Sequence, residues 1–75
     1  MMTSIYFHDY AGSTYNRQHF DMFCEEWGYK VTESHSEIDA ITGDRVTVFV
    51  TDKDTAIHLH CHFPHNAMMG YPIEV

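Results

Sequence analysis

A run of alternating residue types between Thr55 and His65 constrains the fold of this chain more than any other feature. One row of the alternation is apolar, and the other consists of histidines. Alternation with a period of two is typical of a strand with one buried and one exposed face. The run therefore predicts a strand that ends at Pro64, because proline cannot donate to a β-ladder. Its inward row is Ile57, Leu59, Cys61 and Phe63, and its outward row is His58, His60 and His62.

The first part of the chain predicts a strand followed by a helix. Residues 4–10 alternate, with Ile5 and Phe7 on the inward side. Residues 15–27 have helical periodicity; Ser13 or Thr14 offers an N-cap hydroxyl, and Gly28 stands where a left-handed C-cap belongs. The apolar face of this helix, at i, i+3, i+4 and i+7, is Phe20, Phe23, Cys24 and Trp27. Such a face usually enters the core, although Phe20 and Trp27 could instead form a binding stripe.

Two further strands are predicted between the helix and the histidine run. Residues 29–38 are polar in their middle, which is typical of an edge strand whose charges discourage aggregation. The segment could equally end early and continue as a loop. Residues 45–51 alternate clearly, and we expect Val46, Val48 and Val50 to face inward and Phe49 outward.

These elements predict an α+β fold in the order β-α-β-β-β, with one helix packed on a four-stranded mixed or antiparallel sheet. A chain of 75 residues is expected to form a single domain, residues 1–75. Residues 64–75 are expected to be an irregular tail. Since that tail contains Met68, Met69, Tyr71 and Ile73, it should pack on the body or on a partner.

The charge balance narrows the choice of partners. Eleven acidic residues face four basic ones, which gives a net charge of −7 with histidine neutral. Such a chain is repelled by nucleic-acid phosphates and by anionic membranes. It suits a basic protein surface, such as the DNA- or RNA-binding cleft of a nuclease or polymerase. The simpler interpretation, a plain acidic protein without such a partner, fits the same charge.

Carboxylates and outward aromatic rings are the candidate partner-binding residues. Regularly spaced carboxylates can imitate phosphates, although the same residues also suit an ordinary solvated face. The outward aromatic row, opposite the helix, would leave an apolar patch that a homodimer could cover. The candidates are Glu25, Glu26, Glu33, Glu37, Asp39, Tyr6, Tyr10 and Phe49.

The histidine row supports an alternative function. In a strand, the Cα atoms of His58 and His60 lie roughly 6.5–7 Å apart on one face, and two imidazoles at that spacing can share a metal ion. His8 on a neighbouring strand would supply the third ligand that catalytic zinc requires. The alternative is therefore a protein or small metalloenzyme that binds zinc or another transition metal. Otherwise the row is simply the polar face of a sheet, and no cofactor is bound.

An enzymatic function is less well supported than a binding function. The chain contains no HExxH, P-loop or GxSxG motif. Cys24 and Cys61 are expected to be buried free thiols, as in a reducing cytoplasm. A disulfide between them is the alternative, since both could line the same helix–sheet interface. No apolar run approaches the length of a membrane span. We therefore expect a cytoplasmic protein.

In size and charge the chain resembles the small inhibitors that phages and mobile elements use against host nucleases or polymerases, including anti-CRISPR proteins. No motif carries this resemblance, so it assigns no role to any residue. It implies a non-enzymatic inhibitor, cytoplasmic in the host cell, that imitates nucleic acid.

Overall fold

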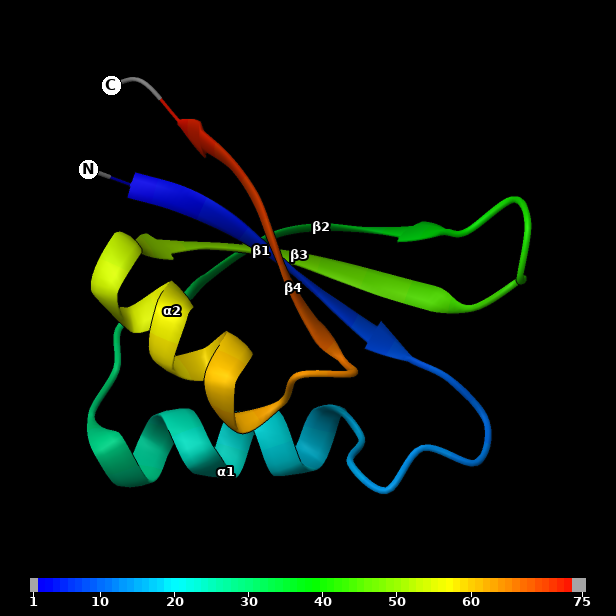
Figure 1. Cartoon of the computed structure of the whole chain (residues 1–75), viewed down its shortest axis with the longest axis horizontal. Helices are drawn as coiled ribbons and strands as arrows, with labels where there is room; N and C mark the ends of the chain where they lie inside the picture. Colours follow the sequence, from blue (N-terminus) through cyan, green and yellow to red (C-terminus); the bar gives the residue numbers. More distant parts are fainter. Residues whose placement is uncertain (1, 74–75) are drawn as a thin grey trace.

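The described residues form six elements in the order β-α-β-β-α-β (Figure 1). The computed structural model describes the backbone of residues 2–73 and the side chains of residues 2–70. The elements are β1 (Met2–Asp9), α1 (Arg17–Trp27), β2 (Thr32–Ile38), β3 (Arg45–Asp52), α2 (Lys53–His62) and β4 (Ala67–Ile73).

The four strands form one antiparallel sheet in the order β2-β3-β1-β4. β3 lies between β1 and β2, and β1 lies between β3 and β4, so each helical connection spans an intervening strand. This is the split βαβ, or ferredoxin-like, arrangement. The predicted α+β class is confirmed, and the sheet is antiparallel throughout.

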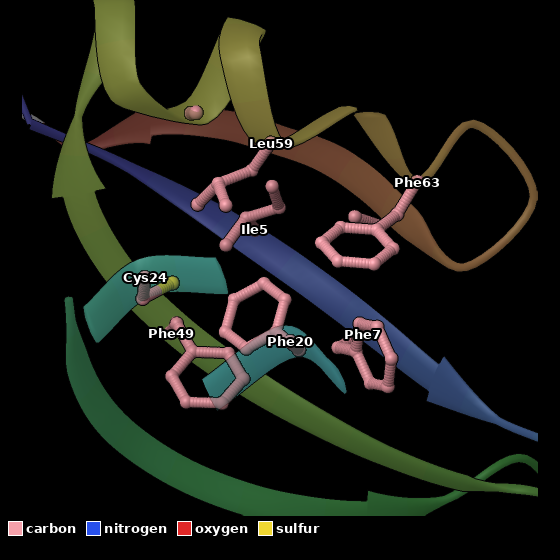
Figure 2. Close-up of a cluster of buried hydrophobic side chains, with 9 residues drawn as sticks. Ile5, Phe7, Phe20, Cys24, Phe49, Leu59 and Phe63 are labelled. Atoms are coloured by element: carbon pink, nitrogen blue, oxygen red, sulfur yellow. The ribbon is translucent and has the colours of Figure 1, made fainter. Parts of the chain in front are cut away.

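Both helices pack on the same face of the sheet, where one core joins all the layers. Phe20 of α1 lies between Phe7 of β1 and Phe49 of β3, with ring centroids 4.9 and 4.7 Å away (Figure 2). Leu59 and Phe63 close the core from the side of α2, at 0% and 1% exposure. Because both helices lie on one face of the sheet, neither covers the opposite face.

The predicted histidine-bearing strand is wrong, because this segment is the helix α2. The carboxylate of Asp52 caps its N-terminus, accepting from Thr55 N at 3.0 Å and from Thr55 Oγ1 at 2.7 Å. Thr55, Ala56 and Leu59 are buried on one helical face. Ile57 and Cys61, which a strand would have buried, are exposed.

The predicted orientation of β3 is also wrong. Phe49 pairs with Ile5 across the sheet, so both side chains lie on the helix-covered face, and Phe49 is 3% exposed. Val46 and Val48 point to the other face. They are nevertheless buried, because larger cross-strand neighbours flank them, with Tyr6 and His35 on either side of Val48.

The ends of α1 differ in how well they were predicted. Gly28 adopts the left-handed conformation, with φ of 70°, as expected of a C-cap. The N-cap is Asn16 rather than Ser13 or Thr14. Asn16 Oδ1 accepts from the backbone N–H of Gln18 and of His19, and His19 Nδ1 accepts from Asn16 N at 3.1 Å. A histidine thus completes the capping box that the sequence seemed to lack.

The C-terminal segment is more regular than predicted. Residues 67–73 form β4, which pairs with β1 along its length with one irregularity near Ser4. Hydrogen bonding to β1 orders a segment whose sequence shows no clear alternation. β2 lies at the other edge of the sheet with every residue exposed, so its prediction as a polar edge strand is confirmed.

Candidate functional site

The most distinctive surface lies along the seam between α1 and α2. One stripe of α1, at i, i+3, i+4 and i+7, carries His19, Met22, Phe23 and Glu26, next to the stripe that enters the core. On α2, His58 and His62 are one turn apart and therefore share a face. Ring contacts between Phe23 and both histidines show that the two stripes meet.

Rings at one end of the seam are held in fixed orientations. The imidazole of His62 stacks on Phe23, with centroids 4.0 Å apart and an interplanar angle of 14°. Phe23 and Tyr15 each meet the buried ring of Phe63 edge-on, at 5.5 and 5.3 Å. Tyr15 also meets His19 edge-on at 5.5 Å. The buried Phe63 thus anchors the more exposed rings around it.

The other end of the seam is built around Trp27. Its ring stacks on Tyr29 at 5.9 Å and meets His58 edge-on at 4.7 Å. The Tyr29 hydroxyl and His58 Nδ1 form a hydrogen bond, which fixes the imidazole. Trp27 nevertheless remains 56% exposed. The prediction that it belongs to the core stripe of α1 is therefore wrong, whereas Phe20 and Cys24 are buried as predicted.

The seam contains an open hollow of about 170 Å³. Glu26 is the one carboxylate in its wall, and no lysine or arginine lines it among the described residues. The remaining polar groups are two imidazoles and a phenol. Its lining residues are Tyr15, His19, Met22, Phe23, Glu26, His62 and Phe63.

The structure does not gather the predicted acidic residues on one surface. Glu25 and Glu26 lie exposed on α1. Glu33 accepts from Arg17 at 2.8 Å between α1 and β2. Glu37 lies on the helix-free face, 3.4 Å from His35 Nε2.

Asp39 has a structural task in the connection between β2 and β3. Its carboxylate accepts from the backbone N–H groups of Ile41 and Thr42, at 2.8 and 3.2 Å. These two bonds hold the pKa of Asp39 below its ordinary value. The predicted role of Asp39 in partner binding is not tested by this geometry, but its Oδ1 already accepts two hydrogen bonds.

The predicted aromatic row is also divided. Tyr6 is half-buried on the helix-free face, and Tyr10 is half-buried beyond the end of β1. Phe49 is in the core and cannot contact a partner; the guanidinium of Arg17 lies 4.8 Å from its ring centroid. The expected row of three exposed rings is therefore incorrect. A homodimer through this face stays a prediction.

The proposed metal ligands are not brought together. His8 lies on β1, whereas His58 and His60 lie on α2, where residues two apart point to different sides of the helix. His60 Nδ1 instead donates to the carbonyl of Ala67 at 2.6 Å. Within the described part of the chain, no three histidine, cysteine or carboxylate side chains are grouped so as to hold a metal ion. The geometry on which the metal-binding alternative depended is thus absent from these residues.

The two cysteines have different environments. Cys24 is buried against the core as predicted, and burial raises the pKa of its thiol to about 11, with a further contribution from the Asp21 carboxylate. Cys61 is exposed, contrary to prediction, because α2 turns it away from the sheet. Both thiols are free.

Comparison with known proteins supplies no relative from which a role could be transferred. No family model, no curated protein and no solved structure matches the chain. Neither helix of the described residues has the length and apolar character needed to cross a membrane. The functional argument therefore depends on this chain's own surface.

Sequence reasoning singled out Glu26 but missed the site around it. The spacing of His19, Met22, Phe23 and Glu26 was a readable signal, since it marks a second helical stripe beside the core stripe. The contribution of His62 was hidden, because it depends on the helical state of α2.

Proposed function

We propose that this protein is a non-enzymatic binding protein that presents the exposed side of its helix layer to a basic protein. The supporting observation is the combination of unpaired acidic charge and exposed apolar side chains on α1. Glu25 and Glu26 are exposed there, and no ion pair to either is found among the described residues. Met22 and Trp27, on the same helix, are 60% and 56% exposed.

This combination fits the anatomy of a protein interface. Aromatic residues and methionine are enriched at interfaces, and a polar rim surrounds the buried centre. Met22 and Trp27 would supply contact area, and the two glutamates would supply the rim. Complementary charge at a rim mainly accelerates association and selects the partner.

The overall charge supports a basic partner. With a net charge of −7, the chain as a whole attracts cationic surfaces. Arg17 is already engaged by Asp21 and Glu33, at 2.9 and 2.8 Å. Clefts that hold DNA or RNA are strongly cationic because they neutralise phosphates, so the partner class we propose is a nucleic-acid-handling protein. Occupation of its cleft would make this chain an inhibitor.

Charge reversal at two separated places tests the proposal. The variant Glu25→Lys/Glu26→Lys changes the helix layer. The control Glu37→Lys/Asp44→Lys makes the same change in net charge around the β2–β3 hairpin, at the far end of the molecule (Figure 1). Each immobilised protein is used to capture partners from a lysate of the source cells at several salt concentrations, followed by mass spectrometry.

We expect a nucleic-acid-handling protein to be retained by the parent and the control and lost from the α1 variant. Its capture by the parent should weaken as salt increases, because exposed charges are screened. Equal retention by both variants would show that net charge alone is responsible. Absence of any such protein among the captured partners would overturn the proposed function.

A further inference from the structure

We propose that the hollow between α1 and α2 is a receptor for one cationic side chain, a lysine or an arginine, of the basic partner. The inference rests on the proposed function, because it names the group that this partner inserts. It depends on three properties of the hollow: its aromatic walls, its single carboxylate and its size.

Aromatic rings line the hollow and contact one another. Tyr15 and Phe23 both stand at 81° to the buried ring of Phe63, and the His62 ring stacks on Phe23. Aromatic faces attract cations through the ring quadrupole, and this attraction underlies the binding of ammonium groups in aromatic cages. Met22 adds a polarisable thioether to the same wall.

The charge of the hollow selects a cation over an anion. Glu26 brings a carboxylate to its wall, and Glu25 lies beside it in an adjoining shallow depression. No lysine or arginine lines the hollow among the described residues. The hollow therefore offers a carboxylate and no fixed positive charge.

The size of the hollow limits what it can hold. Sites for drug-sized ligands and cofactors have volumes of roughly 300–1,000 Å³. The ring-lined hollow of about 170 Å³ lies below this range and admits the head of one long side chain. The adjoining open depression of about 440 Å³ is lined by Met22, Glu25 and Glu26, without an aromatic ring. Since the hollow is open, the chain bearing that head can lie across the surface between the helices.

Matched pairs of blocked amino acids, one cationic and one neutral in each pair, test the site directly. Nα-acetyl-argininamide and Nα-acetyl-lysinamide are titrated into the ¹⁵N-labelled protein, and amide chemical shifts are followed by NMR. Nα-acetyl-citrullinamide has nearly the shape of the arginine probe without its charge, and Nα-acetyl-norleucinamide replaces the lysine probe in the same way. We expect saturable shifts with the cationic probes, centred on residues 15–26 and 62–63, and none with the neutral probes at equal concentration.

Neighbouring glutamates provide the control for position. Glu26→Gln should raise the dissociation constant of the arginine probe about three-fold, the effect of losing an exposed ion pair. Glu25→Gln makes the same charge change one residue along α1, but Glu25 does not line the hollow. Its effect on the dissociation constant of the arginine probe should be less than half of the effect of Glu26→Gln. Circular dichroism of both variants checks that α1 is intact.

Three results would overturn the inference. These are equal shifts with arginine and citrulline probes, equal effects of the two glutamine substitutions, and no saturable shift with either cationic probe. If one of these occurs while the α1 charge-reversal variant still loses its partner, only the receptor site is refuted. If the probes bind as expected and no basic partner is captured, the proposed function is refuted and the cation site stands.

Discussion

Replacement of Asn66 by alanine tests how far the fold depends on a single buried amide. The side chain is 3% exposed. Its Nδ2 donates to the carbonyl of His8 at 2.9 Å and to Ser13 Oγ at 2.8 Å, and lies 3.3 Å from the carbonyl of Tyr15. Asn66 therefore joins the end of β1, the loop before α1 and the connection from α2 to β4.

The expected cost follows from these contacts. Each net hydrogen bond contributes about 0.5–1.5 kcal/mol, and an acceptor left buried without its donor costs about 1–3 kcal/mol. Two short bonds and their shielded acceptors together give about 2–4 kcal/mol of destabilisation for Asn66→Ala. A chain of this length has a total stability of about 4–11 kcal/mol, so the variant loses a large part of it.

Urea unfolding measures this loss. Trp27 is the only tryptophan, and its stacking on Tyr29 makes its fluorescence a reporter of the helix layer. With a slope of about 1–2 kcal/mol/M, the midpoint should fall by about 2 M. Gln18→Ala, which removes an amide at an exposed position of α1, should stay within about 0.5 kcal/mol of the parent. If Asn66→Ala is as stable as this control, the hydrogen bonds of Asn66 do not stabilise the fold as argued.

Two further predictions concern β4 and the cysteines. A Cβ at Gly70 would overlap Ser4 Oγ and lie 2.5 Å from Tyr6 Cε1, so Gly70→Ala should cost about 1–3 kcal/mol in urea unfolding. The same substitution should cost less in a Ser4→Ala/Tyr6→Ala background, which removes both close side chains, and an undiminished cost there would contradict the clash. Iodoacetamide at mildly alkaline pH should label exposed Cys61 in the native protein and spare Cys24, since burial raises the pKa of Cys24 to about 11. Peptide mass spectrometry would detect equal labelling, which would contradict the burial of Cys24.

The elements that the sequence predicted correctly carry local signals. β1 alternates cleanly, and its Ile5 and Phe7 lie in the core as expected. α1 combines a helical stripe with a glycine that its C-cap requires. β2 is polar from Thr32 to Glu37 and forms an exposed edge. In each of these cases the information lies within the element itself.

α2 was wrongly predicted to be a strand, because the spacing of its apolar residues fits the period of a strand and that of a helix. Leu59 and Phe63 are four residues apart, and that spacing places them on one face of a strand or of a helix. The residues that distinguish the two states are Ala56, which is fully buried, and Asp52, which caps the helix at Thr55. The sequence Asp52-Lys53-Asp54 was interpreted as a turn, although an aspartate at its start is also typical of an N-cap.

The orientation of β3 depends on information outside the strand. Val46, Val48 and Val50 form one row, and Phe49 with two threonines forms the other, so either row suits a core. The choice is made by the pairing of Ile5 with Phe49, which places Phe49 under the helices. The hollow between the helices also depends on contacts between separate segments, since Phe23 of α1 and His62 of α2 both line it. Both features follow from tertiary packing and could not be read from one segment.

The correction to β3 changes where apolar surface remains for a partner. The sequence placed Phe49 on the helix-free face, and this made a sheet-mediated homodimer attractive. In the structure that face presents Val46 and Val48 at 3% and 4% exposure, the half-buried Tyr6, and Met68 at 38% exposure. A second copy would therefore bury less apolar surface there than on a row of exposed rings. Met22 and Trp27, exposed by more than half, lie instead on α1 beside the unpaired glutamates. Because association is driven by apolar area that is still accessible, a partner gains more by docking on the helix layer than on the sheet.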